Sequence, residues 1–202
     1  MTTNIQLAET FQILHGFPQE IIEELRAIWE NKEYDVTKEV VPSKFWHYQL
    51  TDKNHPVYRH FEYFQMIEYY KVAPGFRNSP HLDRGRWAAI NIPIEVDLDN
   101  SYFYTGKHIW LGNYEWDPEK NDTNSYLHDA SEHGPKGFYR LTEDQAVKYN
   151  LEKPVIFNTK VPHGGNNVDA STMRTIVSIG VTNKKYEEII NLLPREWFMH
   201  AD

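Results

Sequence analysis

The stretch Met173-Arg174-Thr175-Ile176-Val177-Ser178-Ile179-Gly180-Val181 is the clearest strand pattern in the chain, and it decides the fold class. Successive side chains of a β-strand point to opposite faces. The pattern therefore predicts a strand with one largely apolar face and one face that also holds polar groups. The first face carries Thr175, Val177, Ile179 and Val181, and the second carries Arg174, Ile176, Ser178 and Gly180.

The strand signal recurs along the chain, whereas helical spacing of apolar residues is seen after Pro18 and again at 184–193. Many short strands with few helices indicate a mainly β fold, a sandwich or barrel with flanking helices. Other strand-like runs lie at 34–50, 65–72, 87–94, 101–104 and 153–161, the last of which predicts two strands around a turn.

Residues 105–140 differ from the rest of the chain. They are rich in Gly, Asn, Asp, Trp, Tyr and His and have weak periodicity, so they predict a long insertion with a hairpin. Thr142 and Gln145 then have the spacing of a capping box, which predicts a short helix.

The 202 residues suit one domain, with a sizeable hydrophobic core. A net charge of −8 disfavours a nucleic-acid partner. The chain has no cysteine, which excludes disulfides and any Cys-ligated metal site. No secretory signal opens the chain and no run of 18 apolar residues occurs, so we expect a cytoplasmic protein without a membrane segment.

His81-Leu82-Asp83 is the strongest candidate for chemistry. On an extended strand, residues two apart project from the same face, so the imidazole and the carboxylate would point together. His163 is a third candidate ligand. Two histidines and one carboxylate form the ligand set of non-haem Fe(II) oxygenases. By itself, His-x-Asp is more often an incidental polar pair on a strand or turn than a pair of metal ligands.

Arg174 adds a second feature to the candidate site. It lies eleven residues after His163, at the start of a strand whose alternate positions are apolar. A buried guanidinium is costly when unpaired, and its planar fork suits a carboxylate. Ser178 shares its face and offers a hydroxyl. The alternative is a structural arginine paired with one of the 29 acidic residues.

In this order and spacing, His81, Asp83, His163 and Arg174 resemble the Fe(II)/2-oxoglutarate-dependent oxygenases over residues 65–182. The resemblance implies a double-stranded β-helix, a jelly-roll of the cupin type, with the insertion at about 105–140. It implies that His81, Asp83 and His163 bind Fe(II), which 2-oxoglutarate chelates, and that Arg174 binds the far carboxylate of this cosubstrate.

Further cosubstrate or pocket residues are implied by the same resemblance. Tyr69 or Tyr70 matches the strand that contacts the cosubstrate in prolyl-hydroxylase-like members. Residues 84–93 resemble small bacterial and phage-type members, including those near the aspartyl/asparaginyl hydroxylases, and place Arg86 and Asn91 in the pocket. A surface salt bridge for Arg86 and a strand-bend hydrogen bond for Asn91 are the alternatives.

The activity that this resemblance implies is oxidation by O₂, with release of succinate and CO₂. Asp83 favours hydroxylation, because related halogenases replace this carboxylate with a small residue. The substrate would be a peptide side chain, an amino acid or a small metabolite. The other candidates are a cupin-type isomerase or dioxygenase without 2-oxoglutarate and a non-catalytic jelly-roll module. Only the 2-oxoglutarate-dependent oxygenase needs Arg174 as a carboxylate clamp. The oligomeric state stays open.

Overall fold

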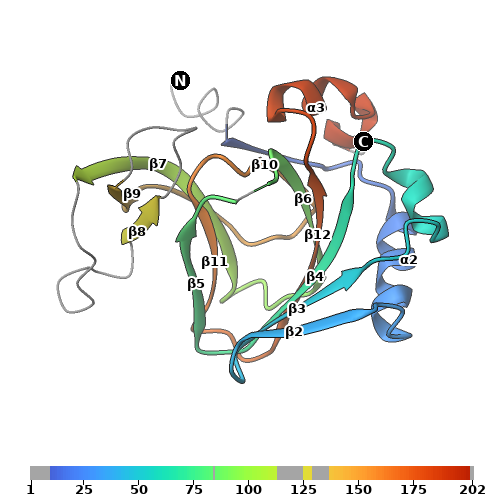
Figure 1. Cartoon of the computed structure of the whole chain (residues 1–202), viewed down its shortest axis with the longest axis horizontal. Coiled ribbons are helices and arrows are strands. Elements are labelled where there is room, and N and C mark those ends of the chain that lie inside the picture. The colour runs from blue at the N-terminus through green and yellow to red at the C-terminus, as the bar shows by residue number, and fades with distance from the viewer. Residues whose placement is uncertain (1–9, 84, 113–124, 129–136, 201–202) are drawn as a thin grey trace.

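Two antiparallel β-sheets face each other in the computed structural model, which describes residues 10–83, 85–112, 125–128 and 137–200 (Figure 1). The larger sheet has the strand order β1-β10-β6-β12-β4-β3-β2 and the smaller has the order β5-β11-β7-β9-β8. The larger sheet comprises β1 (Phe11–Ile13), β2 (Val36–Val41), β3 (Phe45–Leu50), β4 (Met66–Val72), β6 (Ala88–Glu95), β10 (Val155–Asn158) and β12 (Arg174–Val181). The smaller comprises β5 (Phe76–His81), β7 (Tyr102–Gly112), β8 (Ser125–His128), β9 (Gly137–Tyr149) and β11 (His163–Asn167).

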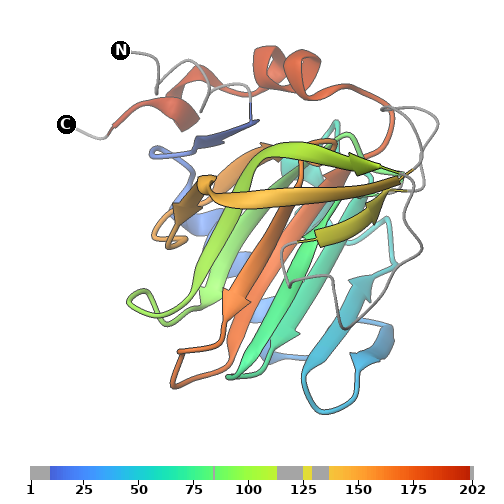
Figure 2. The same ribbon diagram turned by 90° about the vertical axis from the view of Figure 1, so that its left-hand side faces the viewer.

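Helix α2 (Gln19–Glu30) lies along the outer face of the larger sheet, while α3 (Tyr186–Leu192) sits at one end of the sandwich (Figures 1 and 2). Two short 3₁₀ helices, η1 (Pro56–His60) and η2 (Arg195–Phe198), complete the described helical segments. The expected mainly β fold with flanking helices is confirmed. None of the helices in these described ranges is both long and apolar enough to cross a membrane.

The main hydrophobic core lies between α2 and the larger sheet. Ile21, Leu25 and Ile28 of α2 are buried in one cluster with Val177 and Ile179 of β12. The opposite face of β12 carries Arg174, Ile176 and Ser178, which line a cavity between the sheets. The alternation predicted for β12 is therefore confirmed: one face packs in the core against α2, and the other lines the cavity.

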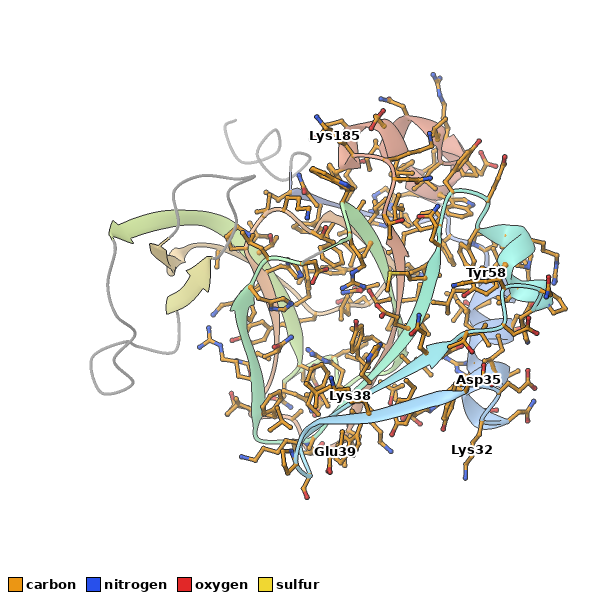
Figure 3. All side chains as sticks on the ribbon, viewed as in Figure 1. Lys32, Asp35, Lys38, Glu39, Tyr58 and Lys185 are labelled. Carbon is orange, nitrogen blue, oxygen red and sulfur yellow. The ribbon has the colours of Figure 1, made fainter. Side chains whose placement is uncertain are left out.

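Side chains fill much of the space between the sheets (Figure 3). Lys38 and Glu39 are labelled in this view on β2, which is the last strand of the larger sheet. The β2–β3 hairpin contributes Val40 of β2 and Phe45 of β3 to the wall of the cavity. The hairpin therefore lines the same cavity as the central strands of the larger sheet.

Three local predictions are wrong. Residues 142–146 lie in strand β9, not in a helix, because β9 pairs with β7 from Phe103↔Tyr149 to Gly112↔Phe138 and sheet pairing overrides the local capping signal. Residues 153–161 contain one strand, β10, and the next strand begins only at His163. Strand β5 ends at His81, so Asp83 follows the strand instead of lying on it. Much of the predicted insertion, at 113–124 and 129–136, lies outside the described residues.

Candidate active site

A cavity of about 340 Å³ opens between the two sheets. The larger sheet contributes polar residues from β6 and β12, and the smaller sheet contributes the ends of β5 and β11. Seven of the eight residues expected at the site line this cavity. These seven are His81, Asp83, Arg86, Asn91, His163, Arg174 and Ser178.

His81, Asp83 and His163 converge at the mouth of this cavity. His81 ends β5 and His163 begins β11, and the two residues are paired directly across the strands. Asp83 Oδ1 lies 3.6 Å from His81 Nε2 and 3.7 Å from His163 Nε2. One ligand atom from each residue lies within 4.8 Å of the other two. Atoms about 2 Å from one ion lie roughly 3–4 Å apart, so this spacing fits a divalent metal.

The tautomer of His163 also fits a metal. Its Nδ1 lies 2.9 Å from the carbonyl oxygen of Val161 and would donate a hydrogen bond to it. Nε2 is then left as the unprotonated nitrogen that faces Asp83, which is the arrangement a metal-binding imidazole needs. The side chain of His163 is 5% exposed, whereas that of His81 is 39% exposed. The open side of the site is therefore the side of His81.

Thr159 fixes the segment that carries Asp83. The Asp83 amide donates to the carbonyl oxygen of Thr159 at 3.1 Å, and the Thr159 hydroxyl donates to the carbonyl oxygen of Arg86 at 2.6 Å. Thr159 is fully buried. Lys160 Nζ adds a hydrogen bond to the Asp83 carbonyl at 3.0 Å. These contacts bring Asp83 beside His81 although the strand has ended, and the sequence reading did not identify Thr159.

Arg86 lies beside Asp83 and is buried. Its Nη2 donates to Asp83 Oδ2 at 2.6 Å, and its Nη1 donates to Glu68 Oε2 at 2.9 Å and to Ser178 Oγ at 3.1 Å. Burial would raise the pKa of Asp83, but its interactions with His163, Arg86 and His81 outweigh burial and hold that pKa below its ordinary value. Arg86 is thus part of a buried ion-pair network and not of a surface salt bridge.

Arg174 is buried without an acidic partner. It is 4% exposed, and Nη1 donates to the backbone carbonyls of Tyr102 at 3.3 Å and Asn166 at 3.5 Å. Its Nε has no hydrogen-bond partner, and no carboxylate pairs with it within the described ranges. Burial lowers its pKa to about 10. An unpaired guanidinium in this position needs an anion, so its surroundings fit a carboxylate ligand.

Tyr69 does not face the cavity, and this corrects the expectation for it. Even-numbered residues of β4 point inward, so Tyr70 lines the cavity while Tyr69 packs under α2. The Tyr69 hydroxyl donates to the carbonyl oxygen of Leu25 at 3.0 Å. The Tyr70 hydroxyl donates to Glu68 Oε2 at 2.9 Å.

Asn91 and Ser178 occupy the same row of the sheet, since they are paired across β6 and β12. Both are buried, and Asn91 Oδ1 has no hydrogen-bond partner among the described residues. Ser178 accepts from Arg86 and not from Arg174. Glu68, which pairs with Ser178 in register on β4, completes this polar row. The sequence reading missed Glu68, because the strand period places it on one face with Tyr70 but does not tell which face of β4 is the inner one.

No protein-family model matches the sequence, and no curated protein matches it. Solved structures do match its fold. The epimerase SnoN from nogalamycin biosynthesis, described as non-heme and alpha-ketoglutarate dependent, aligns with a TM-score of 0.53 and 8% identity, over 88% of this chain and 80% of SnoN. A 2OG-Fe(II) oxygenase family oxidoreductase from Burkholderia pseudomallei aligns with a TM-score of 0.50 and 9% identity, over 90% of this chain and 88% of the oxidoreductase. HygX from Streptomyces hygroscopicus, with nickel and 2-oxoglutarate bound, aligns with a TM-score of 0.50 and 11% identity, over 92% of this chain and 89% of HygX.

The chain shares the jelly-roll fold of these three proteins. The fold class predicted from the sequence is therefore confirmed. At identities of 8–11% the likeness establishes the fold alone, so the activity has to be argued from the side chains in the cavity.

Proposed function

We propose that this protein is an Fe(II)- and 2-oxoglutarate-dependent oxygenase that hydroxylates a peptide side chain, an amino acid or a small metabolite. The observation that carries the proposal is the presence of two complementary features in one cavity. His81, Asp83 and His163 each offer one ligand atom, these atoms lie within 4.8 Å of one another, and together they would hold a metal ion. Arg174 is a buried cation without an acidic partner in the described residues. Only a cosubstrate that is both a metal chelator and an anion uses both features.

The residues divide the work as follows. His81, Asp83 and His163 would hold Fe(II) and leave positions open for other ligands. Bound iron would supply the oxidative decarboxylation of 2-oxoglutarate with O₂, which releases succinate and CO₂. Arg174 would bind the carboxylate of 2-oxoglutarate that does not reach the metal. Its Nε is free for this contact, and its Nη1 is already held by backbone carbonyls.

Apolar side chains on the cavity wall would exclude water from the reacting groups. Phe103, Leu151 and Phe157 are each no more than 3% exposed and line the same cavity as His163. The Phe157 ring lies 4.8 Å from the His163 ring. The substrate would approach from the side of His81, whose side chain is the most exposed of the three ligands.

Succinate formation tests the proposal directly. The full-length protein is loaded anaerobically with Fe(II) and 2-oxoglutarate, exposed to air, and assayed for succinate, with and without pools of candidate peptides and amino acids. We expect succinate above the background of a His81→Ala control, even without the true substrate. Absence of both 2-oxoglutarate binding and succinate would contradict the proposal and favour a cupin-type metal enzyme that does not use 2-oxoglutarate.

A further inference from the structure

Arg86 is held along its whole length. Its stem crosses Gly180 so closely that a Cβ on this glycine would lie 2.6 Å from Arg86 Cδ. Its guanidinium joins Asp83 Oδ2 on one side to Glu68 Oε2 on the other, at 2.6 and 2.9 Å. The side chains of Arg86, Glu68 and Asp83 are each no more than 10% exposed. The arginine therefore bridges two buried carboxylates, only one of which is a candidate metal ligand.

Glu68 is fixed in the same way by the larger sheet. Its Oε1 lies 3.0 Å from His47 Nε2, and its Oε2 accepts from the Tyr70 hydroxyl at 2.9 Å. The His47 ring stacks on Tyr70 with centroids 5.0 Å apart. Burial would raise the pKa of Glu68, but the hydrogen bond from His47 and the charge of Arg86 lower it below its ordinary value. Glu68 is thus a charged group inside the protein.

This network decides how Asp83 can bind a metal. Asp83 Oδ2 is occupied by Arg86, while Oδ1 faces both histidine Nε2 atoms at 3.6 and 3.7 Å. Only one oxygen is therefore directed at the metal position. A carboxylate without such a partner could rotate, or chelate through both oxygens and occupy a position that the cosubstrate needs.

The charge of Arg86 would by itself oppose metal binding, because it lies next to a ligand of a divalent cation. Glu68 carries the opposite charge on the other side of the same guanidinium, 2.9 Å away. The pair Glu68–Arg86 therefore has no net charge. It can orient Asp83 without the electrostatic cost that a lone arginine would bring to the metal position.

We propose that Glu68 and Arg86 are positioning residues that hold Asp83 as a one-oxygen metal ligand, with Glu68 offsetting the charge of Arg86. The inference rests on the proposed metal site. It gives Arg86 a role in ligand orientation in place of cosubstrate binding, and it gives Glu68 a role in metal affinity although it does not face the metal.

Mn(II) affinity of the full-length protein without 2-oxoglutarate tests both parts of this proposal. Free Mn(II) is measured by electron paramagnetic resonance at neutral pH. Glu68→Gln leaves the charge of Arg86 without compensation, and we expect Mn(II) binding to weaken about tenfold or more, the usual effect of losing an outer partner of a metal ligand. Glu68→Gln/Arg86→Met keeps the net charge of the site but removes the clamp, so its loss of affinity measures orientation alone.

The control is Glu24→Gln, which breaks an ion pair with Arg59 on the surface of α2, away from the cavity. We expect this variant to keep the wild-type Mn(II) affinity. The visible spectrum of bound Co(II) gives a second readout, because a change of Asp83 from one to two bound oxygens alters the coordination number. A purely structural role for Glu68 would lower the melting temperature and leave both metal readouts unchanged.

The outcomes separate the two proposals. A wild-type protein that binds no Mn(II) refutes the metal site and with it the proposed function. Wild-type affinity in Glu68→Gln refutes the charge offset, and wild-type affinity and Co(II) spectrum in the double variant refute the positioning role. If Glu68→Gln does not fold, the charge-balanced double variant still decides the positioning role. Mn(II) binding that depends on Glu68 but yields no succinate with Fe(II) would retain the positioning pair and reject the oxygenase.

Discussion

The guanidinium of Arg174 lies against the bare Cα of Gly165, so closely that a Cβ on this glycine would sit 2.7 Å from Arg174 Cζ. Arg174 belongs to β12 in the larger sheet and Gly165 to β11 in the smaller one. The arginine therefore extends across the cavity and ends beside Gly165, two residues from the proposed metal ligand His163. Gly165 is required for this placement because any side chain would occupy the position of the guanidinium.

Gly165→Ala should weaken 2-oxoglutarate binding while the protein stays folded. The guanidinium is the end of a flexible side chain, so it will move instead of the backbone. A misplacement of about 1 Å can cost up to about a hundredfold in a positioned interaction, so we expect affinity to fall roughly ten- to a hundredfold. Titration of the Mn(II)-loaded protein with 2-oxoglutarate measures this. Val168→Ala, an exposed position just after β11, is the matched control, and equal affinities in the two variants would contradict the steric role of Gly165.

Arg174→Met should stabilise the metal-free protein and abolish 2-oxoglutarate binding. The wild-type side chain buries a charge with no acidic partner in the described residues, and replacing a buried charge by an apolar chain of similar length often stabilises by about 1 kcal/mol or more. Urea unfolding without ligand should show the gain. Saturating 2-oxoglutarate with Mn(II) should raise the melting temperature of the wild type only. Equal stabilisation of both proteins by 2-oxoglutarate would remove Arg174 from the cosubstrate site.

The strand period explains why part of the site could be read from the sequence. Alternation along β12 placed Arg174 and Ser178 on one face, and both residues are at the cavity. The same rule applied to β4 separates Tyr69 from Tyr70, but it gives no sign of which face is inner until a partner strand is known. The stacking of Tyr69 on Trp29 of α2 settles that choice, and this contact joins residues 40 positions apart.

The rest of the site depends on contacts that no local pattern carries. Asp83 is held beside the two histidines by the backbone of Thr159, which is 76 residues away in sequence and has no distinguishing motif. Glu68 is one of 29 acidic residues and becomes notable only when Arg86 is seen between it and Asp83. In β9, the helix signal at Thr142 is weaker than the pairing with β7, which is a long-range effect.

Tyr69→Phe should lower stability without changing the cavity. The variant removes the hydrogen bond from a fully buried hydroxyl to the carbonyl oxygen of Leu25, so we expect a loss of about 1 kcal/mol in the free energy of unfolding. Urea unfolding measures the loss. The affinity for 2-oxoglutarate should equal that of the wild type, because Tyr69 lies on the α2 side of the larger sheet. A lower 2-oxoglutarate affinity at unchanged stability would instead indicate that Tyr69 contacts the cosubstrate.

The stability that Glu68 contributes should depend on pH in a defined direction. Interactions with His47, Arg86 and Tyr70 lower its pKa in the folded protein below its ordinary value, in spite of burial. A carboxyl with a depressed folded-state pKa stabilises the protein above its unfolded-state pKa of about 4.3, and this contribution is lost as the pH falls through the folded-state value. Glu68→Gln should therefore be less stable than the wild type at pH 7.

The difference in the free energy of unfolding between the wild type and Glu68→Gln should narrow as the pH falls below about 4.3. In this range the unfolded wild type binds a proton at Glu68 that the folded protein, with its lower pKa, does not yet bind. Urea unfolding of the metal-free proteins at several pH values between 7 and 3 measures the difference. Glu24→Gln, which alters a more exposed carboxylate on α2, is the control and should show a weaker dependence. A stability difference for Glu68→Gln that stays constant, or widens, toward low pH would mean that Glu68 is not a charged partner of Arg86 in the folded protein.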